Sequence, residues 1–152
     1  METKFMKTAL RLAKKAAAAD EVPVGAVIVR DGRIIATGYN RKEKTGNALK
    51  HAEMIAIERA IKKIGDWRLN DCEMYVTLEP CAMCAGAMVN SRIGRLYFGA
   101  YDPKGGCCGS LYDIPSDARL NHRFEATGGI MEEECGRVLS EFFRKKRREK
   151  AE

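Results

Sequence analysis

The segment between residues 73 and 100 constrains the fold most, because its pattern predicts a strand, a helix and a second strand in close succession. The runs EMYVTL (73–78) and GRLYFGA (94–100) have the β-branched and aromatic composition of strands. Pro80 is well placed to open a helix that covers Cys81 to about Asn90. This succession predicts a parallel pair of strands joined by a right-handed crossover.

Further elements are predicted on both sides of this unit. An amphipathic helix is expected over residues 4–19, where apolar residues are spaced by three and four. The runs VPVGAVIVR and RIIATGYN flank Asp31-Gly32, which predicts an antiparallel hairpin. Residues 41–50 are polar and show no periodicity, whereas residues 51–64 predict a helix that ends at Gly65.

The C-terminal third is less regular. Residues 101–122 are rich in Gly, Asp and Pro and predict at most a short helix near residues 110–114. The run RFEAT (123–127) predicts a fifth strand, and a basic helix is expected over about residues 131–150. A chain of 152 residues lies in the single-domain range. We therefore predict one α/β domain over residues 1–152, a three-layer α/β/α arrangement around a five-stranded mixed sheet.

Charged residues interrupt every apolar stretch near the N-terminus, so we expect neither a secretory signal nor a membrane span. The default expectation is a cytoplasmic protein. In a reducing compartment the six cysteines are better interpreted as thiols or metal ligands than as disulfides.

Cys81 and Cys84 have the spacing of a metal-binding pair. Three residues apart on a first helical turn, their β-carbons lie roughly 5–6 Å apart, so both sulfurs can reach one tetrahedral zinc ion. The dipole at the N-terminus of the helix favours the thiolates. His51, at the start of another predicted helix, would be the third ligand.

Three protein ligands leave the fourth position to water, which is typical of a catalytic zinc site that supplies zinc-bound hydroxide. Glu53 lies about 200° around a regular helix from His51, which leaves it free as the catalytic acid and base. A lone Cys-x-x-Cys could instead be a redox pair or half of a structural zinc knuckle, and a lone His-x-Glu is a weak signal. Their joint occurrence at helix starts favours the catalytic interpretation.

Other candidate residues leave alternatives open. Cys72, Cys107, Cys108 and Cys135 have no matching ligand partner and are interpreted as incidental. His122 is either a substrate contact or a surface histidine. The net charge is +6, and the run FFRKKRREK (142–150) resembles a nucleic-acid-binding tail. The same run could also be the solvated end of an amphipathic helix.

His51-Ala52-Glu53 together with Pro80-Cys81-Ala82-Met83-Cys84 resembles the signature of the cytidine-deaminase-like superfamily. Several further segments make the chain similar to the bacterial tRNA adenosine deaminase (TadA) family over nearly its whole length. These segments are EVPVGAVIV, TLEPCAMCAGAMVNSRIGRLYFGAYDPKGG, Asn121-His122 and the terminal basic helix.

The resemblance implies a zinc-dependent enzyme, with one Zn²⁺ per chain, that deaminates adenosine to inosine at the wobble position of a tRNA anticodon, with an arginine-type tRNA as the expected substrate. It implies a homodimer in which each site binds one anticodon stem-loop. By the same resemblance, the substrate-binding residues would be Asn40, Asp102, Lys104, Asn121, Phe142, Phe143 and Arg144. Cys107 and Cys108 depart from the small residues, such as Ala, expected at these positions.

Two other functions are compatible with the same chemistry. The first is a small-molecule deaminase acting on guanine, cytosine or a nucleotide, against which the basic run argues. The second is a non-catalytic RNA-binding subunit with structural zinc, in which Glu53 could be dispensed with.

Overall fold

The structure, a computed structural model, describes residues 3–151 and contains one mixed five-stranded sheet. The strands are β1 (Gly25–Arg30), β2 (Arg33–Tyr39), β3 (Cys72–Leu78), β4 (Arg95–Ala100) and β5 (Glu125–Thr127). The helices are α1 (Thr3–Ala18), α2 (Lys42–Thr45), α3 (Ala52–Ile64), α4 (Ala82–Asn90), α5 (Glu132–Ala151) and the 3₁₀-helix η1 (Ile114–Ser116). The sheet order is β2-β1-β3-β4-β5. β1 pairs antiparallel with β2 and β3, whereas β3, β4 and β5 are parallel, so the predicted mixed sheet is confirmed.

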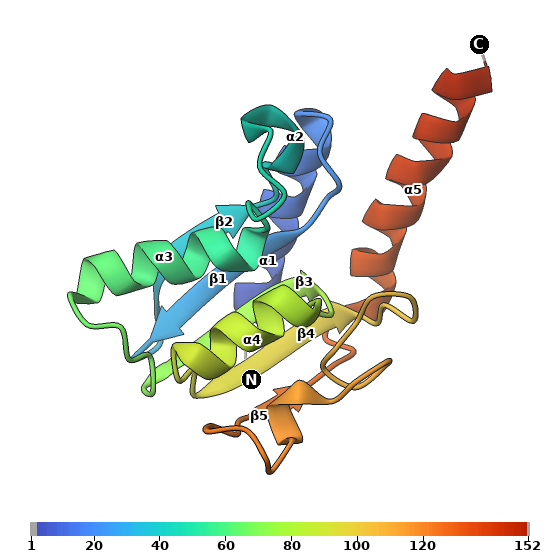
Figure 1. Ribbon diagram of the computed structural model, residues 1–152. Coiled ribbons are helices and arrows are strands. Elements are labelled where there is room, and N and C mark those ends of the chain that lie inside the picture. Colours follow the sequence, from blue (N-terminus) through green and yellow to red (C-terminus); the bar gives the residue numbers. More distant parts are fainter. Residues whose placement is uncertain (1–2, 152) are drawn as a thin grey trace.

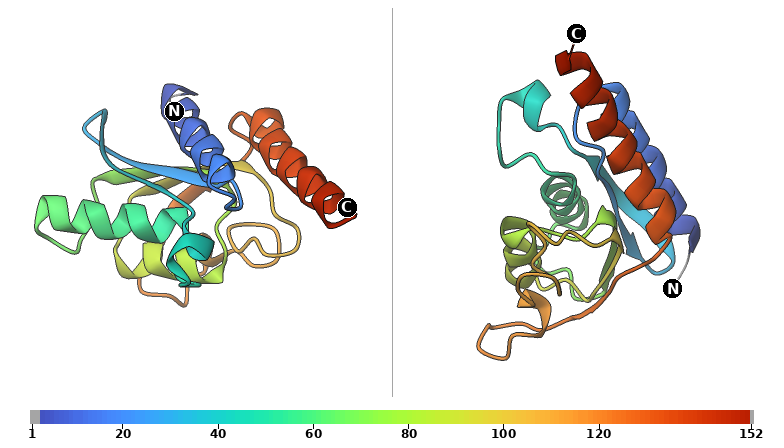
Figure 2. Two further views of the ribbon diagram at one scale, coloured as in Figure 1. Left: turned by 90° about the horizontal axis from the view of Figure 1, so that it is seen from above. Right: turned by 90° about the vertical axis from the view of Figure 1, so that its right-hand side faces the viewer.

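Helices cover both faces of the sheet (Figures 1 and 2). α3 and α4 lie side by side on one face, and α1 and α5 lie on the other. The interior strand β1 divides its side chains between two cores because successive residues point to opposite faces. Ala26 and Ile28 pack with α3 and α4, while Val27 and Val29 pack with α1. The predicted three-layer α/β/α arrangement is therefore confirmed.

The β1–β2 hairpin turns at Asp31-Gly32, as predicted. Both residues have positive φ, 52° at Asp31 and 74° at Gly32, and Arg30 pairs with Arg33 across the turn. Positive φ at both central positions is the mark of a type I′ turn, which matches the twist of the flanking strands. The local sequence alone thus accounts for this edge of the sheet.

The structure corrects the prediction in three irregular segments. The short helix expected near residues 110–114 is wrong, because a bridge between Cys108 and Asp113 forms a tight turn there and η1 begins only at Ile114. β5 is shorter than RFEAT, since the Phe124 amide donates to the Pro115 carbonyl instead of joining the sheet. Residues 41–50 contain α2, and its Glu43 and Lys44 amides donate to the buried Glu21 carboxylate.

None of the helices within residues 3–151 combines the length and the apolar character needed to cross a bilayer.

Gly38 allows α3 to lie directly on β2. A Cβ at this position would lie 2.4 Å from the Ala52 carbonyl oxygen and 3.0 Å from the Ala56 nitrogen, both backbone atoms. Gly38→Ala should therefore push α3 off the sheet and lower the free energy of unfolding by about 1–3 kcal/mol. Gly136→Ala is the control, because a Cβ there meets nothing within 4 Å. This helical substitution should stabilise the protein by up to about 1 kcal/mol. Urea denaturation measures the free energy of unfolding of both variants. Equal values for Gly38→Ala and Gly136→Ala would contradict the steric argument.

Candidate active site

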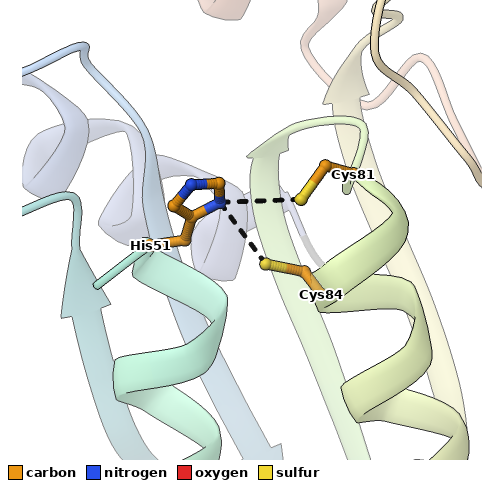
Figure 3. Close-up of side chains that lie close together, drawn as sticks. All are labelled: His51, Cys81 and Cys84. Atoms are coloured by element: carbon orange, nitrogen blue, oxygen red, sulfur yellow. Dashed lines mark hydrogen bonds between the residues drawn. The ribbon is translucent and has the colours of Figure 1, made fainter. Parts of the chain in front are cut away.

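Two adjacent helix starts bring an imidazole and two thiols together. His51 is the N-cap residue of α3 (φ −74°, ψ 154°), and Cys81 is the N-cap residue of α4 (φ −77°, ψ 179°). Cys84 follows in the first turn of α4 and is fully buried. Figure 3 shows the three side chains pointing toward one another from the two helices. The His51 Nδ1 atom lies 3.6 Å from the Sγ atom of each cysteine.

These distances fit a single tetrahedral metal ion. Zinc–sulfur bonds of about 2.3 Å and zinc–nitrogen bonds of about 2.0–2.1 Å place neighbouring ligand atoms roughly 3.6 Å apart at the tetrahedral angle. One ligand atom from each residue lies within 4.8 Å of the other two, which identifies a group that could hold a metal ion. The predicted convergence of His51, Cys81 and Cys84 is thus what the structure shows.

The two thiols differ sharply in acidity when no cation is between them. Hydrogen bonding with Cys84 is the main cause that lowers the pKa of Cys81 to about 4. The same hydrogen bond, together with burial, raises the pKa of Cys84. The pKa of His51 is raised chiefly by its hydrogen bond with Cys81. One proton is therefore retained on Cys84, and a bound cation would favour loss of that proton as well.

Glu53 lies beside this group without belonging to it. The residue is in the first turn of α3, is 4% exposed and lines the same pocket as His51 and Cys81. Its carboxylate is not among the atoms that converge on the candidate metal position. Burial is the largest cause that raises the pKa of Glu53 to about 7. A carboxyl group with a pKa near neutrality can both accept and donate a proton at physiological pH.

The pocket around these residues has a volume of about 190 Å³. It is lined by Val22, Val24, Asn40, Lys42, His51, Ala52, Glu53, Leu78, Glu79, Cys81 and Asp102. The apolar residues in this set would face the flat surface of a small ring, and the polar ones are available for hydrogen bonds.

Two of the predicted substrate-binding residues, Asn40 and Asp102, line this pocket. The Asn40 Nδ2 atom donates to the Val22 carbonyl at 3.2 Å, and Oδ1 accepts from the Lys42 amide at 3.1 Å. An amide side chain has two donors and two acceptor positions, so Asn40 keeps one of each for a ligand. The Asp102 Oδ1 atom accepts from the Lys104 amide, and Lys104 itself is exposed outside the pocket lining.

Phe142 and Phe143 line a separate groove of about 820 Å³ between the end of α1, α2 and α5. Val22 lines both this groove and the pocket, so the two adjoin. Lys146 forms an ion pair with Asp20, just after α1, and lies over the Phe142 ring, so its side chain links this part of α5 to the end of α1. The C-terminal part of α5 extends past the sheet (Figure 1). Arg144 is exposed on this part of the helix.

Asn121 and His122 lie elsewhere. Asn121 is exposed and does not line the pocket. The His122 Nε2 atom is 2.7 Å from the Ile93 carbonyl oxygen, and its ring stacks on Phe124. Ile93 follows the C-terminal end of α4, whereas Cys81 lies at its N-terminal end. Within this chain the structure does not bring Asn121 to the candidate site, and His122 holds a loop in place.

The four remaining cysteines are buried and take no part in the metal-binding group. Burial raises the pKa of Cys72 to about 11 and that of Cys135 to about 12, and it raises the pKa of Cys108. Such thiols stay protonated at neutral pH and react slowly. This agrees with their interpretation as incidental.

Glu79 was missed by the sequence reasoning. It is 2% exposed, lies between β3 and Cys81, and lines the pocket. Burial by itself would raise the pKa of Glu79, but hydrogen bonds with Ser110 and with the Asp102 and Cys108 amides lower it. The signal in the sequence that could have identified Glu79 is its position, since it is an acidic residue directly between an apolar strand and the Pro80-Cys81 pair.

Comparisons with known proteins agree with this site. The sequence profile of the MafB19-like deaminases matches residues 1–147. A tRNA-specific adenosine deaminase from Bacillus subtilis is 51% identical over 96% of this chain and 91% of its own length. One from Haemophilus influenzae is 49% identical over 98% of this chain and 87% of its own length.

Solved structures show the same fold. A structure from work on A-to-I editing by tRNA:A34 deaminases at the wobble position is 43% identical, with a TM-score of 0.88 over 91% of this chain and 100% of its own. A guanine deaminase from Bacillus subtilis is 39% identical, with a TM-score of 0.63 over 66% of this chain and 65% of its own. The chain therefore belongs to the MafB19-like deaminases and, among them, to the family of tRNA-specific adenosine deaminases.

Proposed function

We propose that this protein hydrolytically deaminates adenosine to inosine at the wobble position of a tRNA anticodon, with an arginine-type tRNA as its substrate. The observation that carries the proposal is the convergence of His51, Cys81 and Cys84 beside a buried carboxylate, Glu53, that is not a ligand. The membership in the family of tRNA-specific adenosine deaminases supports the choice of substrate.

We assign zinc to the metal position, with one ion per chain held by His51 Nδ1 and the Sγ atoms of Cys81 and Cys84. Two thiolates and one imidazole are a donor set that zinc prefers, and the 3.6 Å separations match its bond lengths. When bound there, zinc would lower the pKa of a water molecule toward neutrality.

The protein's own residues would carry the protons. A Glu53 carboxylate oxygen would take a proton from the attacking water and transfer it to N1 of the adenine ring. Once the water oxygen is bonded to C6, Glu53 would take the remaining proton from that hydroxyl group and transfer it to the exocyclic nitrogen, so that the C6–N6 bond breaks, ammonia leaves and a C6 carbonyl forms. Asn40 would orient the base through its unused donor and acceptor, and Val22, Val24 and Leu78 would exclude bulk water.

A nucleotide in an anticodon loop suits a pocket of this size. Its base is largely unpaired, so extruding it costs less than opening a duplex. The groove at Phe142 and Phe143 would receive flanking bases by stacking, and the exposed cations of α5 would contact phosphates. We further propose that the protein acts in the cytoplasm, where a tRNA substrate would be available, and that it is a homodimer with one stem-loop per site.

An arginine-type anticodon stem-loop tests the proposal. Purified protein should form inosine at the wobble adenosine, with about one zinc per chain measured in the same sample. Free guanine, cytosine and cytidine should remain unchanged at matched concentration. Efficient deamination of a free base with an untouched stem-loop would instead establish a small-molecule deaminase.

Exposed cations on α5 should determine the salt dependence of RNA binding. Lys145 and Arg147 are both exposed, whereas Lys146 is engaged by Asp20. Replacing Lys145 and Arg147 with Gln should weaken binding and flatten the slope of log K against log salt by about one unit for each phosphate that is no longer neutralised. Lys62→Gln with Lys63→Gln, an equally exposed pair near the end of α3, is the charge-matched control. Equal slopes for the two double variants would exclude α5 as a phosphate-binding element.

A further inference from the structure

One buried carboxylate organises the loop that forms a rim of the pocket. The Glu79 Oε1 atom accepts a hydrogen bond from the Asp102 amide at 3.0 Å and another from the Ser110 hydroxyl. The Oε2 atom accepts from the Cys108 amide at 3.1 Å and from the Ser110 amide at 2.9 Å. All four donors come from residues 102–110, which contain neither an α-helix nor a sheet strand.

The loop closes tightly around this carboxylate. A Cβ on Gly106 would lie 2.2 Å from the Glu79 Cδ atom, so only glycine permits the approach. The Gly106 amide donates to the Asp102 carbonyl at 2.8 Å, and the Cys107 amide donates to the Pro80 carbonyl at 2.9 Å. The loop is thus anchored both at Glu79 and at its neighbour Pro80.

The position of Glu79 connects two parts of the site. It follows the end of β3 and comes two residues before Cys81, while the loop that it holds carries Asp102, another residue of the pocket lining. A buried carboxylate is costly unless donors surround it, and buried amides are costly without an acceptor. The loop conformation and the Glu79 carboxylate therefore depend on each other.

We infer that Glu79 is a positioning residue that holds the 102–110 loop against the pocket, so that Asp102 meets the substrate nucleotide in a fixed orientation. The inference rests on the proposed function, because it deepens the account of how that same site recognises its substrate. It assigns Glu79 no direct contact with the reacting atoms.

Steady-state kinetics on the stem-loop separate this role from a merely structural one. Glu79→Gln keeps the side-chain size but places an NH₂ donor against the backbone amide donors of the loop. We expect this variant to have a KM raised about tenfold or more and a kcat changed by less than about threefold. Zinc content should stay at one per chain. A lower kcat with an unchanged KM in folded Glu79→Gln protein would overturn the inference.

The matched control is Glu73→Gln, near the start of β3 and outside the pocket lining, whereas Glu79 directly follows the end of that strand. It should leave KM, kcat and zinc content unchanged. Gly106→Ala disturbs the contact between the loop and the Glu79 carboxylate from the loop side, so it should raise KM in the same way as Glu79→Gln. Ser110→Ala removes one of the four donors and should give a smaller increase, which keeps the test available if Glu79→Gln does not fold.

A double-variant cycle that combines Glu79→Gln with Asp102→Ala tests whether Glu79 affects KM through Asp102. If Glu79 acts through the Asp102 loop, the combined increase in KM is smaller than the product of the single increases. If the combined increase in KM equals the product of the two single increases, the inference is overturned.

Amide hydrogen exchange provides a readout that needs no turnover. Exchange at Asp102, Cys108 and Ser110 should be about tenfold or more faster in Glu79→Gln than in Glu73→Gln. Unchanged protection would overturn the positioning role. Absence of inosine formation by the unmodified protein would instead refute the proposed function, so the two failures are distinguishable.

Discussion

Glu53→Gln is expected to lower kcat for inosine formation by about 10²–10⁴-fold, the usual contribution of a positioned acid and base. The amide keeps the size of the side chain but cannot take a proton from water or return it to the leaving nitrogen. Metal content should stay at about one zinc per chain, because the Glu53 carboxylate lies outside the group of converging ligand atoms. Steady-state inosine assays and metal analysis of the same preparation measure the two quantities.

Glu58→Gln in the same helix is the matched control. Glu58 is exposed and forms an ion pair with Lys50 at 3.7 Å, so its replacement should change neither turnover nor zinc content. Glu53→Ala should also retain the metal, which separates loss of the proton carrier from an effect of the introduced amide. Turnover within tenfold of the unmodified protein in both Glu53 variants would remove the proposed role of this residue.

Loss of the metal is expected to have the second large effect, on stability as well as on activity. Free zinc at about a hundred times its Kd stabilises a folded protein by about 2.7 kcal/mol. Chelation should therefore lower Tm by about 5–11 °C for a domain of this size. Cys84→Ser should abolish this response, because Cys84 is fully buried and its sulfur lies 3.6 Å from the imidazole of His51. Differential scanning fluorimetry with and without chelator measures the shift.

Cys72→Ala is the control for this experiment. Cys72 is buried and lies outside the metal-binding group, so its replacement lowers Tm without removing the response to chelator. Adding zinc back should restore both Tm and turnover in this variant but not in Cys84→Ser. A Cys84→Ser protein that binds zinc with undiminished affinity would contradict the ligand assignment.

Local sequence signals predicted the regular elements well, and particular residues show why. The type I′ turn at Asp31-Gly32 depends on the left-handed backbone conformations that these two residue types tolerate. The spacing of Cys81 and Cys84 places both sulfurs on one helical turn whatever surrounds them. These properties belong to a few neighbouring residues, so they can be recognised without knowledge of the fold.

Long-range contacts account for the failures. α2 begins where the buried Glu21 carboxylate receives the Glu43 and Lys44 amides, a contact across more than twenty residues. The turn at residues 108–113 replaces the expected short helix because Glu79, about thirty residues earlier, binds the Cys108 and Ser110 amides. Neither contact leaves a periodic pattern in its own segment.

By itself the sequence determined the starts of α3 and α4, the alternation of the strands and the chemical types of the candidate ligands, because these follow from spacing and backbone preference. Only the tertiary structure decided that His51 and the two cysteines approach within 3.6 Å, that Glu53 is buried beside them, and that Asn121 lies elsewhere. The physical reason is that α3 and α4 must pack on the same face of the sheet before their N-termini can meet. That packing depends on the burial of apolar surface from distant segments, which no local pattern encodes.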